Sequence, residues 1–469
     1  FGSEQKAILE HPLASSSKEI NLSALYEYMT FQNILTDNTL IKNIKLLPPG
    51  TIARLSLITK KIVFNKYWDY SFEEPLHKID KNEYKEELNR LLDQAVKRQL
   101  VSDVEIGCYL SGGMDSGTVS SIASSVFKDI KTFTCGFDLS SASGIELSFD
   151  ERRKAEAMSA LFKTEHYEMV LKAGDMERCL PDLARHIEEP RVGQSYPNFY
   201  AAKLASKFVK VVLSGAGGDE LFGGYPWRYY GPASSNSFDE YIDNYYLFWQ
   251  RLISNSDLKN IFKPVWGQVE DVWTKDIFLD VFGSDHKNPS SPEDFINQSL
   301  YFECKTFLHG LLVIEDKLSM SQSLETRVPF LDNDLVEFSM KCPVNLKLNN
   351  LQQSMRIDEN DPVKKTQKYF KKTNDGKQIL RDVMSNYVPS EITEGVKQGF
   401  SAPDSSWFKG ESIDFVRNKL IENDSILYNY LDKKSIVNLV EQHLKGKENK
   451  RLLIWSLINL DEYLNQLSL

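Results

Sequence analysis

The feature that most constrains this chain is a regular alternation of short apolar segments and amphipathic segments between residues 104 and 213. The predicted strands are 104–110, 131–137, 165–170 and 210–213, and the predicted helices are 117–127, 150–162, 176–187 and 198–208. Strands that alternate with helices predict an α/β fold with a parallel sheet and helices on both faces. In such sheets, ligands bind beyond the carboxyl ends of the strands.

The flanking segments have a different character. Residues 1–70 contain one helical pattern, at 21–31, and two alternating patterns typical of paired strands, at 51–55 and 61–64. A polar linker is predicted at 70–80 and a helix at 81–100, whereas the chain beyond residue 225 is mostly helical in pattern and rich in aromatic residues. We therefore expect two domains, residues 1–75 and residues 81–469, the first of them the end of a sheet domain and not a whole one.

Charge and hydropathy restrict the partners. The chain has 469 residues and a net charge of −10, which disfavours non-specific binding to nucleic acid and to anionic membranes. It contains no apolar stretch of about 18 residues, the length that a membrane-spanning helix needs. We expect no nucleic-acid partner and no membrane partner, although a local basic pocket for phosphates remains compatible with the overall charge.

The cysteines indicate the redox setting. There are five, an odd number, and they form no C-x-x-C or Cys/His spacing, so neither a disulfide framework nor a zinc site is expected. Buried free thiols in a reducing compartment are the simpler interpretation. We accordingly expect a cytoplasmic protein.

Two glycine-rich loops follow predicted strands. The first is Leu110-Ser-Gly-Gly-Met-Asp-Ser116, at a strand end and a helix start, where free N–H groups and the helix dipole favour phosphate. Ser111 and Ser116 add hydroxyl donors, and Asp115 implies Mg²⁺, because a carboxylate beside phosphate needs a cation between them. The second loop is Ser214-Gly-Ala-Gly-Gly-Asp-Glu220. Asp219 would share the Mg²⁺ with Asp115 if the two strands are neighbours.

These motifs resemble those of a known family. S-G-G-M-D-S is similar to the pyrophosphate loop of the PP-loop ATP pyrophosphatases, and L-S-G-A-G-G-D-E-L-F-G-G-Y resembles the second signature of the asparagine synthetases within that group. Three further stretches agree, at 133–137, 324–332 and 397–400. The resemblance covers about residues 85–460, with all five motifs in the family's order.

The resemblance implies a role for each matching residue. The family's fold would be a PP-loop sheet with a helical C-terminal region. Asp115 and Asp219 would bind Mg²⁺, and Lys397 would contact the phosphates. These three residues would be the catalytic ones. The residues that would line the ATP and pyrophosphate site are Leu110, Ser111, Gly112, Gly113, Asp115, Ser116, Cys135, Ser214 and Gly215. Glu220, Glu325 and Arg327 would shape the site or bind substrate, the last two as an ion pair.

The implied reaction uses ATP and Mg²⁺. A carboxylate, with aspartate as the first choice, would attack the α-phosphorus of ATP and release pyrophosphate. Ammonia would then attack the acyl-adenylate and give asparagine and AMP. The partners would be a small carboxylate substrate and ammonia, and the resemblance also leaves open a homodimer.

Residues 1–70 resemble the tail of a glutamine amidotransferase domain, with an F-x-S-E-x-K-A start and the turn Leu47-Pro48-Pro49-Gly50. In that family an N-terminal cysteine hydrolyses glutamine. No cysteine lies near Phe1, so the chain as given is expected not to hydrolyse glutamine, and to be a fragment or to lack residues that are not shown. Free ammonia would remain a nitrogen source.

Two departures from the family pattern keep alternatives open. Asparagine synthetases usually carry an acid in the second loop, as S-G-E-G, and this chain has Ala216 there, which leaves the general base unassigned. Residues 188–195 also differ from those of aspartate-selective synthetases. The alternatives are an amide or lactam synthetase acting on another carboxylate, such as a sugar acid, and a nucleotide-binding module without catalysis. An RNA-modifying PP-loop enzyme is disfavoured by the net charge.

Overall fold

The computed structural model describes residues 1–16, 18–76, 80–283, 289–350, 375–395 and 401–467. Its centre is a five-stranded sheet in the order β5-β4-β3-β6-β7, with every neighbouring pair parallel. The strands are β3 (Ile106–Tyr109), β4 (Lys131–Phe137), β5 (Glu165–Leu171), β6 (Val211–Leu213) and β7 (Glu325–Arg327). The predicted parallel α/β fold is therefore confirmed, with an additional strand, β7, whose polar residues Glu325, Thr326 and Arg327 do not indicate a buried strand.

The strand order creates a crevice at the centre of the sheet. The chain runs from β3 outward to β4 and β5, and then returns to the other side of β3 for β6 and β7. Cys108 of β3 pairs with Leu213 of β6, so the two strands end almost side by side. Ligands of open α/β sheets bind where the strand order reverses in this way, outside the carboxyl ends.

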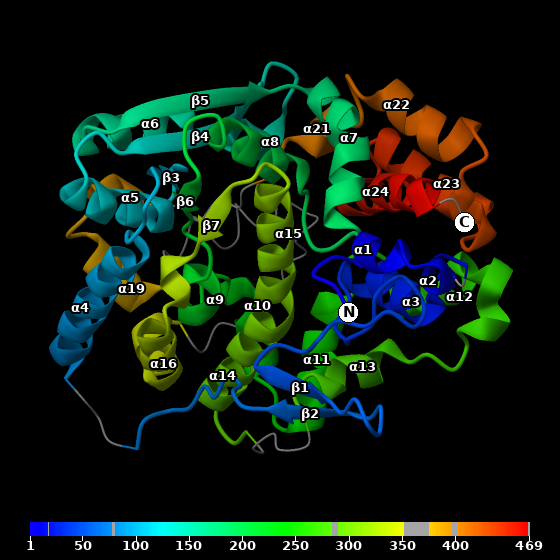
Figure 1. Cartoon of the computed structure of the whole chain (residues 1–469), viewed down its shortest axis with the longest axis horizontal. Helices are drawn as coiled ribbons and strands as arrows, with labels where there is room; N and C mark the ends of the chain where they lie inside the picture. The colour runs from blue at the N-terminus through cyan, green and yellow to red at the C-terminus, as the bar shows by residue number, and fades with distance from the viewer. Residues whose placement is uncertain (17, 77–79, 284–288, 351–374, 396–400, 468–469) are drawn as a thin grey trace.

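Helices cover both faces of the sheet (Figure 1). On one face lie α4 (Lys81–Gln99), α5 (Met114–Val126), α6 (Arg152–Phe162) and α19 (Gln378–Met384). On the other lie α7 (Ala173–Ile187), α8 (Tyr196–Ala205) and α15 (His309–Met320). The helix predicted at 117–127 begins earlier, at Met114, so Asp115 and Ser116 lie in its first turn.

A second, helical region follows the sheet below β7 in Figure 1. Its helices are α9 (Gly218–Phe222), α10 (Pro226–Ala233), α11 (Phe238–Trp249), α12 (Asn255–Ile261), α13 (Thr274–Asp280), α14 (Pro292–Glu303), α16 (Asn333–Lys341) and α17 (Val344–Lys347). The aromatic residues that the sequence concentrates here form its core, where Phe278 packs on Phe302 with ring centroids 4.4 Å apart. Ring packing of this kind adds to the burial of apolar area.

The C-terminal helices are α20 (Ser390–Thr393), α21 (Asp404–Trp407), α22 (Ile413–Arg417), α23 (Lys433–Leu444) and α24 (Arg451–Leu467). The last of these packs beside α7, and Trp455 in its centre is fully buried. None of the helices in the described ranges is long and apolar enough to cross a membrane.

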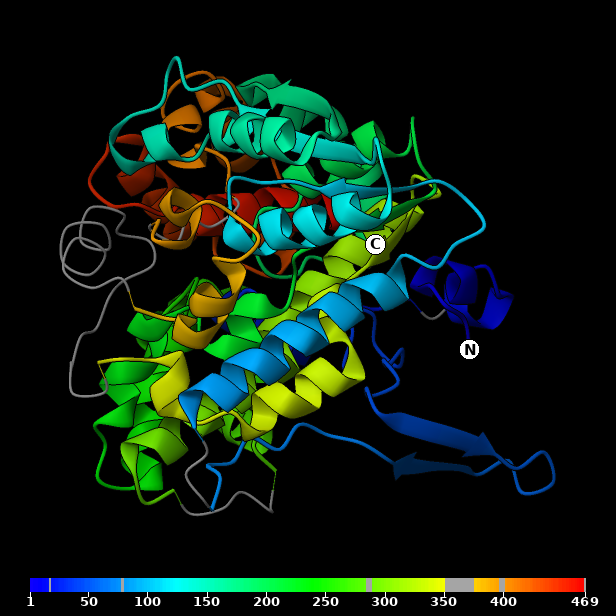
Figure 2. The ribbon, with the colours of Figure 1, turned by 90° about the vertical axis from the view of Figure 1, so that its left-hand side faces the viewer.

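The N-terminal segment contains α1 (Gln5–Leu9), α2 (Pro12–Ser15) and α3 (Leu22–Phe31), followed by the antiparallel pair β1 (Thr51–Leu55) and β2 (Ile62–Lys66). The predicted hairpin is thus present, and it stands away from the body of the molecule (Figure 2). Ile52 and Phe64 are 54% and 58% exposed. Helix α3, by contrast, is buried, and the backbone N–H of Leu40 donates to Glu189 Oε2 at 2.9 Å.

Candidate active site

A cavity of about 470 Å³ opens beyond the carboxyl ends of β3 and β6. Its volume lies in the usual range for small-molecule sites, roughly 300–1,000 Å³. Both glycine-rich loops line it, together with residues from α8, α15 and the start of α19. The structure therefore brings the two predicted motifs into one site, although about 100 residues of chain separate them.

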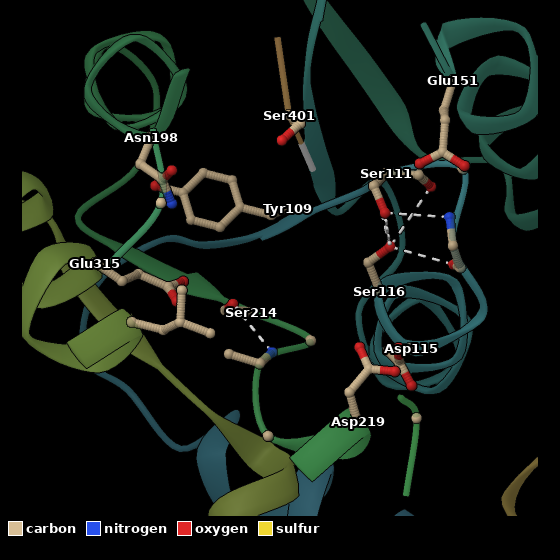
Figure 3. A pocket seen from close by; sticks show the side chains of 18 of the residues that line it. Tyr109, Ser111, Asp115, Ser116, Glu151, Asn198, Ser214, Asp219, Glu315 and Ser401 are labelled. Atoms are coloured by element: carbon tan, nitrogen blue, oxygen red, sulfur yellow. Dashed lines mark hydrogen bonds between the residues drawn. The ribbon is translucent and has the colours of Figure 1, made fainter. Parts of the chain in front are cut away.

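The first loop forms a hydroxyl-rich turn at the start of α5 (Figure 3). The Ser111 backbone N–H donates to Ser116 Oγ at 3.0 Å, and the two hydroxyl oxygens are 2.9 Å apart. The Gly113 N–H donates to Ser111 Oγ at 3.1 Å, while no side chain caps α5 at Gly113. The free end of this helix is thus directed at the cavity, which is favourable for an anion.

The second loop comes very close to the first. A Cβ atom on Gly215 would lie 2.8 Å from the backbone nitrogen of Ser116 and 3.1 Å from the carbonyl carbon of Asp115. Only glycine fits between these backbone atoms without a shift of one loop. The close contact explains why the sequence has glycine here, and it places Asp219 beside Asp115.

Asp115 and Asp219 converge on one cation. The Lys377 ammonium lies 2.6 and 2.8 Å from the two carboxylate oxygens of Asp115, and 2.9 Å from Asp219 Oδ1. Lys377 is buried and has a left-handed backbone, with φ of 56°. A non-glycine residue held in this conformation is a strained feature that tends to occur at functional sites. We refer to Ser111, Asp115, Ser116, Asp219 and Lys377 as the loop end of the cavity.

The opposite end has no such ammonium among its described residues. Tyr109, Asn198, Ser214 and Glu315 surround it, and we call them the helix end (Figure 3). Glu315 projects from α15 toward Ser214 (Figure 3). Burial in the protein raises the pKa of Glu315 above its usual value and outweighs the opposing effect of the nearby Ser214 hydroxyl, while the charge of Asp316 adds the smallest contribution, a further rise.

Comparison with known proteins is consistent with this geometry. A sequence model of asparagine synthase matches residues 87–465, and one of the glutamine amidotransferase domain matches residues 1–68. Asparagine synthetase [glutamine-hydrolyzing] 1 of Bacillus subtilis (strain 168) is 28% identical over 98% of this chain and 70% of its own length. A putative asparagine synthetase [glutamine-hydrolyzing] of Mycobacterium tuberculosis (strain ATCC 25618 / H37Rv) is 26% identical over 97% of this chain and 69% of its own length.

The chain belongs to the asparagine synthase family. It is accordingly a ligase that forms C–N bonds, and asparagine synthases use ATP. The N-terminal match adds an amidotransferase segment. The resemblance inferred from the five motifs is confirmed.

Most residues that the asparagine synthase resemblance singled out line the cavity. Besides those already described, they include Leu110, Gly112, Cys135 and Glu220. Burial raises the pKa of the Cys135 thiol to about 12, so the thiol stays protonated, and contact with a ligand through the backbone suits it better than thiolate chemistry. The Tyr225 hydroxyl donates to Glu220 Oε1 at 3.0 Å.

The structure places Glu325 and Arg327 outside the cavity, and the prediction for Lys397 stays untested. Glu325 and Arg327 do form an ion pair, with 2.7 Å between Arg327 Nε and Glu325 Oε1, but neither lines the cavity. The Arg327 guanidinium instead donates to the carbonyl oxygens of Gln99 and Val101 at the end of α4. Lys397, predicted to contact the phosphates, lies outside the described residues.

Sequence reasoning missed Lys377 and Glu315. Lys377 follows Asp375-Gly376, an ordinary turn signal, and lies 262 positions from Asp115. Glu315 occurs in a helical pattern of mixed polarity, where a solvated carboxylate is the usual interpretation. No spacing rule joins either residue to the loops, so only the tertiary structure reveals them.

Proposed function

We propose that this chain synthesises an amide from a carboxylate, aspartate first, and ammonia, with ATP cleaved to AMP and pyrophosphate. The observation that carries the proposal is the meeting of two serine- and glycine-rich loops at the switch point of the sheet, with Asp115 and Asp219 on one cation. A site of this kind can hold a polyphosphate in contact with N–H groups, hydroxyls and positive charge.

In the first step, a carboxylate oxygen of the substrate attacks the α-phosphorus of ATP. The bond from that phosphorus to the bridging oxygen breaks, and pyrophosphate leaves with the electron pair. We assign the leaving pyrophosphate to Ser111, Gly112, Gly113 and Ser116, and the adenosine part to the backbone near Leu110, Cys135, Ser214 and Gly215. Lys377 is placed to neutralise charge on the leaving group, because its ammonium lines the cavity at the same end as the first loop.

The loop end also suits Mg²⁺. Magnesium is usually held by one or two carboxylates together with substrate phosphates, and two carboxylates here converge on a single cation. Within the described ranges no three His, Cys, Asp or Glu side chains form a metal cage, so the protein would supply Asp115 and Asp219 and ATP the remaining oxygens. When bound, the ion would neutralise charge on the triphosphate.

In the second step, ammonia attacks the acyl carbon and AMP leaves. Water must be excluded, since it would hydrolyse the same intermediate. Helix α15 lines the cavity with apolar residues such as Leu311 and Ile314. Apolar surroundings favour a neutral nucleophile over a charged one. The amidotransferase match at residues 1–68 supports glutamine as the origin of ammonia in the intact enzyme. The reaction belongs in the cytoplasm, where ATP is abundant.

Carboxylate-dependent exchange between ATP and labelled pyrophosphate tests the first step. We expect exchange with Mg²⁺ and aspartate, and a loss of about 10²-fold or more in Asp115→Ala. Asp103→Ala is the matched control, because Asp103 is exposed in the segment before β3. A folded wild-type chain that gives no exchange with any carboxylate would refute the proposal.

A second carboxylate substrate is favoured by one observation. The segment 188–195 contributes Gln194 and Ser195 to the cavity wall. The Ser401 hydroxyl donates to Gln194 Oε1 at 3.0 Å, and Gln194 is only 7% exposed. Sugar acids and other amino acids therefore belong in the same exchange screen. Exchange with one of them alone would retain the chemistry and change the substrate.

A further inference from the structure

The second step of the proposed reaction needs a proton acceptor. When ammonia attacks an acyl carbon, the nitrogen becomes positively charged and must lose a proton before a stable amide can form. The second loop has an alanine, Ala216, and not an acid at the point where it lines the cavity. The acceptor must therefore come from another residue that reaches the cavity.

Among the residues that the structure describes, five acidic ones line the cavity, namely Asp115, Glu151, Asp219, Glu220 and Glu315. Two of them, Asp115 and Asp219, are ion-paired with Lys377. Glu220 accepts a hydrogen bond from the Tyr225 hydroxyl at 3.0 Å. A carboxylate held by a cation or by a strong donor is a weaker base, because the partner stabilises its charged form.

Glu151 lies at the wrong end. Its Cβ would be 2.6 Å from a Cβ placed on Gly112, so its side chain covers the first loop. Lys154 Nζ lies 3.7 Å from its carboxylate. This position is next to the proposed pyrophosphate site, where a proton acceptor for ammonia would be remote from the acyl carbon.

Glu315 lines the cavity beside the start of the second loop. It belongs to the helix end, and its side chain points toward Ser214 (Figure 3). Ser214 Oγ accepts the backbone N–H of Ala216 at 3.3 Å. The Ser214 side chain thus lies next to Glu315 and is bonded to the backbone of Ala216.

We propose that Glu315 is the general base of amide formation in this chain, where position 216 has an alanine and no acidic side chain. The inference rests on the proposed function. As nitrogen forms its bond to the acyl carbon, the carbon–oxygen bond to AMP breaks and AMP takes the electron pair. One proton passes from nitrogen to the Glu315 carboxylate, which later releases it to solvent. The raised pKa of this carboxyl group supports the role, because a more basic carboxylate accepts a proton more readily.

The test separates the two half-reactions. Wild type, Glu315→Gln, Glu270→Gln and the double variant Ala216→Glu/Glu315→Gln are compared in pyrophosphate exchange and in amide formation from ammonium chloride. Glu270→Gln is the matched control, since Glu270 is exposed, does not line the cavity and undergoes the same substitution. Glutamine keeps the size of Glu315 and its ability to bond Ser214, so the variant is expected to fold, which its thermal midpoint will verify.

We expect Glu315→Gln to keep exchange within about threefold of wild type and to lose amide formation by about 10²-fold or more, the usual contribution of a general base. The double variant Ala216→Glu/Glu315→Gln should form amide at least tenfold faster than Glu315→Gln alone. A purely structural role of Glu315 would not allow this rescue. Unchanged amide formation in Glu315→Gln, or an equal loss in both assays, would overturn the inference while leaving the proposed function intact. Absence of exchange in wild type would instead overturn the proposed function, and this inference with it.

Discussion

The two ends of the cavity hold carboxylates in opposite electrostatic settings. At the loop end, Asp115 and Asp219 contact a buried ammonium, so their negative charge is balanced before any ligand arrives. At the helix end, Glu315 points toward the Ser214 hydroxyl, no ammonium of a described residue pairs with it, and burial raises its pKa. Balanced carboxylates suit the binding of cations and phosphates, whereas a carboxylate that is costly to ionise suits proton transfer.

Removal of the Lys377 ammonium should have the largest effect on the charge balance at the loop end. Lys377→Met would leave two carboxylates side by side, so we expect exchange to fall by about 10³-fold. Without Mg²⁺, the free energy of unfolding should fall by about 3 kcal/mol, the usual scale for a buried charge that loses its partner. Urea denaturation and the exchange assay measure the two effects. Lys207→Met, at an exposed lysine, is the control, and an equal response of both variants would contradict the assignment.

The separation of the two ends depends on close contact between the loops. Gly215→Ala would press a methyl group against the Ser116 backbone, and we expect exchange to fall by about 10²-fold, because small displacements of reacting groups cost that much. Gly267→Ala is the matched control, since nothing lies within 4 Å of its added methyl group. If both substitutions leave exchange unchanged, the loop contact is not needed for the first step.

The pH dependence should differ between the half-reactions. Glu315 acts as a base only when ionised, and its pKa is raised, so activity is present above that pKa and is lost as pH falls through it. Amide formation, corrected for the concentration of free ammonia, should therefore fall about tenfold per pH unit below the pKa of Glu315. Exchange should not share this decline. If exchange declined at low pH in the same way, or if amide formation by Glu315→Gln still did, the decline could not be assigned to Glu315.

The smallest expected effect concerns Mg²⁺ in the absence of nucleotide. The Lys377 ammonium and a metal ion compete for Asp115 and Asp219, so Lys377→Met should bind Mg²⁺ about fivefold more tightly than wild type, or about 1 kcal/mol. Isothermal titration calorimetry gives both constants, and Asp115→Ala in the same background provides the reference without the site. Equal affinities would show that the lysine and the metal occupy different places.

Much of the loop end could be predicted from the sequence. Both motifs occur directly after apolar strands, and the parallel order of such strands brings their carboxyl ends to one edge. The predictions for Ser111, Asp115, Ser116, Ser214 and Asp219 rested on this local rule, and all five residues line the cavity. The helix boundaries were less accurate, because Met114 to Ser116 carry no apolar periodicity although they begin α5.

The helix end could not be predicted, because its residues belong to separate elements. Tyr109, Asn198, Ser214 and Glu315 come from β3, α8, the end of β6 and α15. Their meeting depends on how the helices pack on the sheet, and no short-range pattern encodes that packing. Glu325 and Arg327 illustrate the same limit, since their spacing indicated an ion pair but not that β7 would direct it toward α4, away from the cavity.

The sequence by itself determined the parallel α/β fold, the family and the two loops, because these depend on local periodicity and on motifs a few residues long. Only the tertiary structure decided that Lys377 would neutralise Asp115 and Asp219, and that Glu315 would reach the cavity beside Ser214. The reason is physical: the charge balance and pKa of a buried group depend on neighbours within a few ångströms, and here those neighbours are up to 262 residues apart along the chain.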